Sequence, residues 1–439
     1  MPLNKTLLKV TDRIIERSKD SREKYVDRMK SAVERGPRRA HLSCGNQAHA
    51  YAAMGTDKEK LANKRVPNIG IVSAYNDMLS AHQPFHNFPD LIKREARNHG
   101  GTAQVAGGVP AMCDGITQGE TGMELSLFSR DVIAMAAGIA LSHNTFDTTV
   151  YLGVCDKIVP GLVMAAATFG FLPAIFLPAG PMTSGLPNNE KSLVRQKFAT
   201  GEIDRAELMS AEMKSYHGPG TCTFYGTANS NQMLMEFMGL QLPGSSFVNP
   251  GTPLRDALTR YGTQRALDIS TSSSEFCPAY EILNEKAFVN GIVGLMATGG
   301  STNLVLHIPA MAKAAGINLA MEDFEDIAKL IPLMAKIYPN GLADVNHFHA
   351  AGGLSFMINE LLNEGFLHDD VKNVNGHGMS QYRNEARLID NEIGFPSGAV
   401  TSTNQKILRP LKNPFQITGG LKQVTGNLGS AITKVSAVE

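Results

Sequence analysis

A thiol, a carboxylate and an amine stand side by side at Cys155-Asp156-Lys157. They follow Thr148 to Val154, a β-branched and apolar run that predicts a buried strand, and they precede a predicted helix. The carboxyl end of a parallel strand is where α/β proteins place their ligand sites. A thiolate suits a soft iron centre and a carboxylate suits a hard divalent cation, so the triplet is typical of a metal site. The structural alternative is a helix-capping Asp156 beside a buried cysteine and a solvated lysine.

Two further groups have the right chemistry to join this site. Cys222 lies in a Gly-Pro-Gly-Thr-Cys-Thr run just ahead of a predicted helix, and a helix N-terminus lowers a thiol pKa and favours negative charge. Asp114 follows another predicted strand end and would bring a second carboxylate to the edge of the sheet that carries Asp156. The alternatives are a capping loop that contains a cysteine and a turn aspartate before glycine.

The cysteines do not form a disulfide framework. There are five, an odd number, and none belongs to a C-x-x-C pair; they are Cys44, Cys113, Cys155, Cys222 and Cys277. Zinc-ribbon and ferredoxin spacings are absent as well. The thiols are therefore either buried packing residues or metal ligands, and only their neighbours distinguish the two.

A glycine turn and a histidine pair are weaker signals. The run from Thr298 to Asn303 precedes a helix that begins near Leu304, and backbone amides at such a start could hold a phosphate or a carboxylate. An ordinary helix cap explains the same pattern. His347 and His349 form an H-x-H pair, which we interpret as packing residues.

The elements around these residues alternate between strand and helix. This predicts an α/β fold with a mostly parallel sheet flanked by helices. The predicted strands are 69–74, 103–106, 148–154 and 174–177, and the predicted helices are 88–97, 125–141, 162–169 and 220–240. The polar segment 184–220 predicts a loop with a helical excursion, 289–362 an α-rich stretch, and 431–438 a strand.

The domain organisation follows from where composition changes. We expect a helical extension over residues 1–65, a large α/β domain over 66–385, a turn-rich linker over 386–411, and the start of a β-rich domain over 412–439, the rest of which is absent.

Composition points to a small-molecule partner. Lys and Arg number 41 and balance 41 Asp and Glu, so no global field attracts nucleic acid or an anionic membrane. The longest apolar stretch is too short to span a bilayer, and the N-terminus lacks the pattern of a signal peptide. We expect a cytoplasmic protein that binds neither nucleic acid nor membrane. P-loop, G-x-G-x-x-G, H-E-x-x-H and G-x-S-x-G motifs are all absent.

Taken together, these motifs resemble those of the dehydratase family that comprises dihydroxy-acid and 6-phosphogluconate dehydratases. The matching runs are 155–161 (CDKIVPG), 220–222 with 227–229, 114–116 with Gly119, 126–133 (SLFSRDVI), 178–182 (PAGPM) and 299–303 (GGSTN). The 6-phosphogluconate branch is the more similar one. Its version of one segment resembles 75–84 (YNDMLSAHQP), where Ala81 stands at the position of a cluster cysteine in the dihydroxy-acid branch.

The resemblance implies a [4Fe-4S] cluster held by Cys155 and Cys222. Because Ala81 cannot serve, the third thiolate is open: Cys113 is the first candidate and Cys44 the second. The resemblance also implies Mg²⁺ or Mn²⁺ at the positions of Asp114, Asp156 and Lys157, with the lysine carbamylated; these three are the candidate catalytic residues.

The implied reaction removes water from 6-phospho-D-gluconate to give 2-dehydro-3-deoxy-6-phosphogluconate, a step of the Entner–Doudoroff route. Hydroxide is a poor leaving group, so a cluster iron acting as Lewis acid suits the reaction, and a nearby cation would stabilise the enol-like carboxylate. The candidate substrate-binding residues are Ser301, Thr302, Asn303, His82 and Arg130. A homodimer is implied as well.

Two alternatives remain open from the sequence. One is a dehydratase for another sugar acid or a dihydroxy acid. The other is a catalytically inert, truncated binding domain, because family members continue into a β-rich swivelling domain that closes over the site. If 439 residues are the whole polypeptide, we expect an incomplete site with little or no activity.

Overall fold

A four-stranded parallel sheet forms the centre of the computed structural model, which describes residues 2–62 and 66–438. The strands lie in the order β2-β1-β3-β4, with bounds β1 Asn68–Ser73, β2 Thr102–Gly108, β3 Thr148–Leu152 and β4 Ala174–Phe176. All three pairings are parallel. β1, β3 and β4 are buried along their whole length, which explains their unbroken apolar runs, whereas the edge strand β2 is half-exposed beyond its second residue. The expected α/β class and parallel sheet are confirmed.

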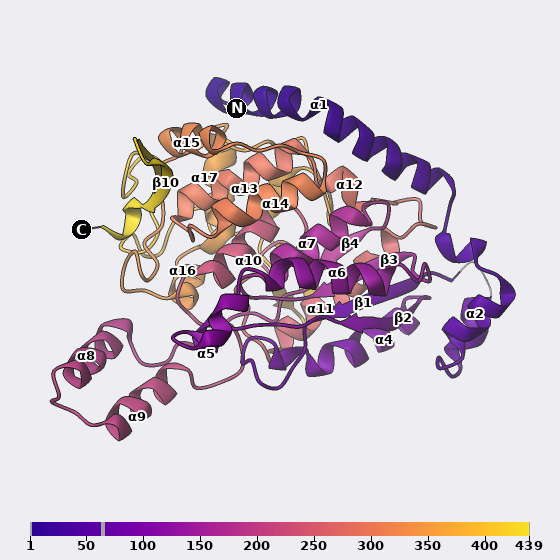
Figure 1. The fold of residues 1–439 in the computed structure, drawn as a ribbon, viewed down its shortest axis with the longest axis horizontal. Coiled ribbons are helices and arrows are strands. Elements are labelled where there is room, and N and C mark those ends of the chain that lie inside the picture. Colours follow the sequence, from indigo (N-terminus) through magenta and orange to yellow (C-terminus); the bar gives the residue numbers. More distant parts are fainter. Residues whose placement is uncertain (1, 63–65, 439) are drawn as a thin grey trace.

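Helices cover both faces of this sheet (Figure 1). The bounds are α4 Phe88–Asn98 and α11 Pro253–Asp268 on one side, and α6 Ser129–Leu141 and α7 Ile158–Thr168 on the other. α6 packs on α7, and α4 packs on α11. α7 is almost entirely buried because a further helix, α14 (Leu304–Ala314), packs on its outer side.

A second, helical layer follows the sheet. Its members are α10 Thr227–Phe237, α12 Ala279–Ile282, α13 Glu285–Thr298, α15 Met321–Leu330, α16 Val345–Ala350 and α17 Gly353–Asn363. α13 is buried from Ala287 to Thr298 and packs on α10, so it forms the core of this layer. The expected α-rich stretch is confirmed. Within the part of the chain that the structure describes, no helix is long and apolar enough to cross a membrane.

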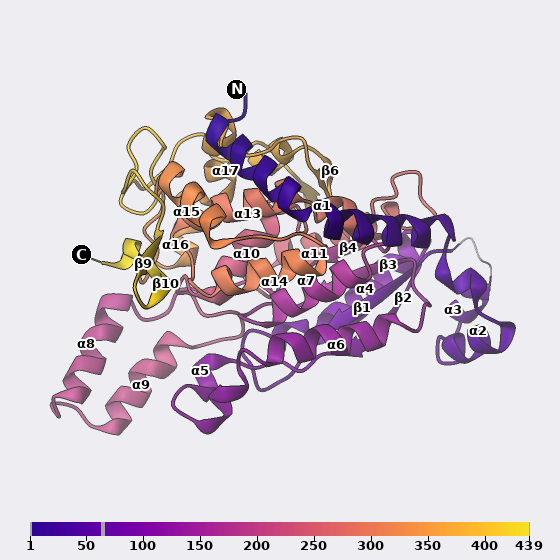
Figure 2. The same ribbon diagram turned by 45° about the horizontal axis from the view of Figure 1, so that its top comes forward.

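The N-terminal helix α1 (Lys5–Glu34) runs along the outside of the helical layer (Figure 2). Its buried stripe includes Leu7, Val10 and Ile14. Arg13 and Arg17 bind the fully buried carboxylate of Asp323 at the start of α15, at 2.8 and 2.6 Å. Two short helices, α2 (Cys44–Tyr51) and α3 (Asp57–Ala62), lead from α1 toward the sheet.

The polar segment 184–220 folds differently from our expectation. Instead of a loop with one helical excursion, it forms two helices, α8 Asn188–Ala199 and α9 Arg205–Ser215, which pack on each other and project from the body (Figure 1). Asp204 and Glu207 form a capping box that starts α9, and Arg195 binds Glu212 between the two helices at 2.6 Å. Local caps and a cross-helix ion pair thus support helices whose sequence lacks a broad apolar face.

The chain ends in short antiparallel pairs of strands. They are β5 Lys372–Asn373 with β6 Gly376–His377, β7 Arg387–Ile389 with β8 Glu392–Gly394, and β9 Leu421–Gly426 with β10 Gly429–Lys434. The expected strand at 431–438 begins two residues earlier and ends at Lys434, where a 3-10 turn over Val435–Ala437 follows. Between these pairs, Leu408 is fully buried and bridges to Ala335.

Candidate functional site

Three chain segments that leave the sheet at its carboxyl edge meet at the candidate site. The first follows β1 and carries His82, the second follows β2 and carries Cys113 and Asp114, and the third follows β3 and carries Cys155 to Lys157. Parallel strands bring such segments together because all their carboxyl ends share one edge. The expected placement of Asp114 and Asp156 at the same edge is observed: both lie beside Lys157.

Three of the five thiols gather here. The Cys155 thiol donates a hydrogen bond to the sulfur of Cys113. Cys222 lies close enough for the negative charge of Cys113 to raise its pKa. The hydrogen bond from Cys155 lowers the pKa of the Cys113 thiol to about 6. The same bond, together with burial, raises the pKa of Cys155 well above its usual value, and burial raises that of Cys222 to about 11.

The other two thiols lie elsewhere. Cys44 is exposed at the start of α2, which lies far from α5 (Asp114–Thr117), the short helix that follows Cys113 (Figure 1). Cys277 is buried, and burial raises its pKa to about 11. The structure therefore brings Cys113, rather than Cys44, to the two motif cysteines.

The thiols of Cys113, Cys155 and Cys222 fit a group bound by soft sulfur ligands, although they do not form a ready-made binding site. Over residues 2–62 and 66–438, no three histidine, cysteine, aspartate or glutamate side chains stand in a ready-made metal-binding arrangement. Backbone amides of Gly115 and Ile116 donate to the Cys113 sulfur. Amide donors of this kind stabilise thiolate charge, which a cluster requires.

A buried lysine joins the two carboxylates. The Lys157 side chain is 2% exposed, forms a close ion pair with Asp114, and lies 3.4 Å from Asp156 Oδ2. Ser126 donates to Asp114 Oδ1 at 2.7 Å. Burial works to raise the pKa of Asp114, but Lys157 and Ser126 hold it below its usual value, whereas burial raises the pKa of Asp156 to about 6. Two carboxylates converging on one position suit a hard cation in the place that the ammonium group now takes.

Helix α10 holds both cysteine-bearing loops through its asparagines. Asn231 is fully buried, and its amide nitrogen donates to the carbonyls of Cys155 and Asp156, at 3.1 and 2.8 Å. Asn229 donates to the carbonyls of Cys222 and Phe224, at 2.7 and 2.8 Å. Both asparagines are buried, so this part of α10 faces the cysteine-bearing loops rather than solvent.

The candidate substrate-binding residues fall into three places. Ser301 and Asn303 lie at the start of α14 and bind the Thr227 hydroxyl at the start of α10, at 2.8 and 3.2 Å; Thr302 lies between them, partly exposed. His82 is fully buried, and its Nε2 lies 3.2 Å from the Val154 carbonyl, directly before Cys155. Burial lowers the pKa of His82 to about 4, so it is a neutral ring behind the Cys155 turn.

Arg130, the third of these places, lies beside His307, a residue that the sequence did not mark as functional. Its Nε binds Asp131 at 3.0 Å, and its Nη1 lies 3.5 Å from Nδ1 of His307 in α14. His307 is fully buried, and the charges of Lys157 and Asp114 act on its ring. In the sequence it occupies one position of an apolar helical run, where a histidine is expected to be a packing residue, so no local signal marked it.

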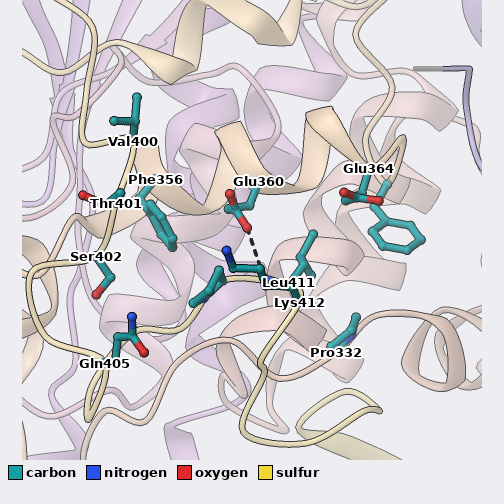
Figure 3. Close-up of a pocket in the computed structure, with 12 residues that line it drawn as sticks. Pro332, Phe356, Glu360, Glu364, Val400, Thr401, Ser402, Gln405, Leu411 and Lys412 are labelled. Carbon is teal, nitrogen blue, oxygen red and sulfur yellow. Dashed lines mark hydrogen bonds between the residues drawn. The ribbon is translucent and has the colours of Figure 1, made fainter.

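Each histidine of the H-x-H pair lies beside one carboxylate. In α16, His347 lies 2.8 Å from the capping Asp344, and His349 lies 3.7 Å from Glu385. A cavity of about 570 Å³ lies elsewhere, between α17 and the segment 400–412 (Figure 3). Glu360 and Lys412 are among its lining residues, and Glu360 accepts a hydrogen bond from the Leu411 amide at 3.1 Å. None of the candidate site residues lines it.

Comparison with known proteins identifies a family to which the chain is similar. The family described as dihydroxy-acid/6-phosphogluconate dehydratase, N-terminal, matches residues 66–382. A phosphogluconate dehydratase of Rhizobium meliloti (strain 1021) is 61% identical over the whole chain, which covers 73% of that relative. The phosphogluconate dehydratase of Escherichia coli (strain K12) is 53% identical over 99% of the chain and 72% of the relative. A dihydroxy-acid dehydratase of Acetivibrio thermocellus is 33% identical over 94% of the chain and 70% of its own length.

Proposed function

This chain belongs to the dihydroxy-acid/6-phosphogluconate dehydratase family, and we propose that it dehydrates 6-phospho-D-gluconate to 2-dehydro-3-deoxy-6-phosphogluconate. The observation that carries the proposal is the meeting of three thiols with an Asp–Lys–Asp group at one sheet edge. The identity of 61% to one phosphogluconate dehydratase, against 33% to a dihydroxy-acid dehydratase, favours the phosphorylated sugar acid as substrate.

The cluster ligands in this proposal are Cys155, Cys222 and Cys113. A [4Fe-4S] cluster held by these three would supply a Lewis acid for the departure of hydroxide, with one iron left free of protein ligands. Cys113 is preferred over Cys44 because its sulfur already accepts a hydrogen bond from Cys155, whereas Cys44 lies exposed on α2. Asn231 and Asn229 orient the two loops that carry the motif cysteines.

Asp114, Asp156 and Lys157 are the candidate catalytic residues. The two carboxylates would bind Mg²⁺ or Mn²⁺, with Lys157 moving aside or acting as a carbamate. Either cation, metal or ammonium, would stabilise the negative charge that grows on the substrate as its C2 proton leaves. The amides and hydroxyls of Ser301, Thr302 and Asn303 at the start of α14 would hold an anionic end of the substrate. His82 would support the site by holding the Val154 carbonyl in place through its Nε2, rather than by contacting the substrate.

We further propose a cytoplasmic homodimer. A run of exposed apolar side chains on α6 and the segment before it supports self-association; these include Leu125, Leu127, Phe128, Met135 and Ile139. Sedimentation of the purified chain tests the dimer.

The decisive experiment is anaerobic purification followed by iron and sulfide analysis and an assay for 2-keto acid formation. Phosphogluconate, gluconate and dihydroxyisovalerate should be compared, before and after exposure to air. We expect turnover of phosphogluconate that is lost in air together with the cluster. A colourless protein that is active in air would reject the cluster, and preferred turnover of dihydroxyisovalerate would move the chain to the other branch. Ligand binding without turnover would identify an inert binding domain.

A further inference from the structure

The imidazole of His307 carries a buried polar atom that nothing in the described chain satisfies. The side chain is fully buried in the second turn of α14, and its Nε2 has no hydrogen-bond partner among the described residues. Its other nitrogen, Nδ1, lies 3.5 Å from Arg130 Nη1. Buried polar atoms are rarely left without a partner, so a missing partner deserves an explanation.

The neighbouring arginine decides which nitrogen carries the proton. A guanidinium can only donate hydrogen bonds, so Nδ1 of His307 must accept, and the proton of a neutral ring then resides on Nε2. Burial, followed by the charges of Arg130 and Lys157, lowers the pKa of His307 to about 4, which keeps the ring neutral. The unsatisfied atom is therefore an N–H donor that requires an acceptor.

The surroundings select a negatively charged acceptor. Arg130 lies in the first turn of α6, Lys157 immediately precedes α7, and His307 lies near the start of α14; these three helices lie side by side (Figure 2). Helix N-termini carry partial positive charge, and two full positive charges add to it. The acidic groups nearby are Asp114, which is paired with Lys157, and Asp131, which is paired with Arg130.

We propose that Nε2 of His307 binds an oxyanion of the substrate as a neutral donor, and that Arg130, on the opposite side of the ring, is the positioning residue that keeps the proton on Nε2. The proposal rests on the proposed function for the identity of the substrate. It deepens that function by assigning a neutral oxyanion donor to His307 and a positioning role to Arg130. Two groups of phosphogluconate share this chemistry, the carboxylate on C1 and the phosphate on C6.

Calorimetric titration under anaerobic conditions tests the pair without requiring turnover. The ligands are 6-phosphogluconate, gluconate, which lacks the phosphate, and glucitol 6-phosphate, which lacks the carboxylate. The variants are His307→Leu, which removes both ring nitrogens, and His307→Gln, whose amide nitrogen can replace the Nε2 donor. The matched control is His368→Leu, because His368 is a buried histidine that binds Thr11 of α1 at 2.8 Å instead.

We expect His307→Leu to weaken the binding of 6-phosphogluconate about tenfold or more, and His307→Gln to restore part of the loss. A loss of affinity that is confined to gluconate identifies the carboxylate as the bound group. A loss of affinity that is confined to glucitol 6-phosphate identifies the phosphate. Unchanged affinity in His307→Leu, an equal loss in His368→Leu, or no binding of any ligand by the unaltered protein would overturn the proposal. Binding without turnover would count against the proposed reaction and leave this pair standing.

Discussion

The thiol of Cys155 donates a hydrogen bond to the sulfur of Cys113, although the two residues follow different strands of the sheet. The contact exists because β2 and β3 flank β1 and end at the same edge. The bond favours the thiolate form of Cys113 and disfavours that of Cys155, because Cys155 donates and Cys113 accepts. A metal centre that displaced this proton would bind both sulfurs.

We expect the replacement Cys113→Ser to reduce cluster content strongly, because a hydroxyl is a poor ligand for iron where a thiolate is required. The measurement is iron and acid-labile sulfide per chain after anaerobic reconstitution. Cys44→Ser and Cys277→Ser are the controls, and both should retain the cluster. Equal iron in Cys113→Ser and the unaltered protein would remove Cys113 from the ligand set, and a loss in Cys44→Ser would put Cys44 in its place.

Asn231→Ala should lower both stability and cluster content. Its amide satisfies the buried carbonyls of Cys155 and Asp156, and leaving such groups without a donor costs about 1–3 kcal/mol. Urea unfolding of the cluster-free protein measures the first effect, and iron analysis measures the second.

Asn290→Ala is the matched control for Asn231. Asn290 is also fully buried, on α13, and binds the backbone of His368 twice, at 2.9 and 2.8 Å. It should lose similar stability and keep its iron. Parallel losses of iron in both variants would mean that Asn231 acts through general stability alone.

The backbone of Cys155 gives a prediction that separates conformation from ligand chemistry. Its φ of 74° lies in the left-handed region, which costs a non-glycine residue about 1–2 kcal/mol. In the cluster-free protein, Cys155→Gly should therefore be more stable than Cys155→Ala by about 1 kcal/mol. At Cys222, whose φ is not positive, the order should reverse. Thermal unfolding of the four variants measures both differences. If the glycine and alanine variants have the same order of stability at both positions, the backbone of Cys155 is not strained.

Much of this site was predictable because its residues sit at strand ends. The buried runs before Asp114 and before Cys155 predicted strands, and the parallel topology then required their carboxyl ends to meet. The fold class, the family and the shared edge of these residues are confirmed. The gathering of Cys113 with Cys155 was one of two alternatives in the sequence, and only the tertiary structure distinguishes them.

The remainder depends on contacts between segments far apart in the chain. His307 and Arg130 are 177 positions apart, and a histidine within an apolar helix has no local mark of a charged neighbour. Helices α8 and α9 were missed for a different reason. They bury few residues and no broad apolar face, and the Asp204 cap and the Arg195–Glu212 pair are recognised only in the folded structure, so periodicity alone did not reveal two helices.

Acid should weaken the attachment of α1 through His368. The side chain is 4% exposed, and its Nε2 lies 2.8 Å from the Thr11 hydroxyl, which donates its own proton to the Leu7 carbonyl. Burial lowers the pKa of His368 from 6.5 to about 4, against the opposing charge of Asp370; Lys286 lowers it further and Asp12 raises it. The folded protein therefore holds a neutral ring where the unfolded chain would take up a proton.

The sign of the pH dependence follows from that difference. The contribution of His368 is complete above pH 6.5, and it is lost as the pH falls from 6.5 toward 4, because the unfolded chain binds more protons in that window. Since one pKa unit corresponds to about 1.4 kcal/mol, the loss attributable to this residue is at most about 3.5 kcal/mol. His82 and His307, whose pKa values are also lowered to about 4, add losses of the same sign.

His368→Gln isolates this contribution, because a glutamine amide can still donate to Thr11 but does not titrate. Urea unfolding at pH 7, 6, 5 and 4.5 should show a smaller decline in the free energy of unfolding for this variant than for the unaltered protein. Limited proteolysis at the lower pH values should release α1 more slowly from the variant. The control is His377→Gln, which changes an exposed histidine of β6 and should leave the decline as it is. If His368→Gln and His377→Gln decline alike, protonation of His368 is not what loosens the helix.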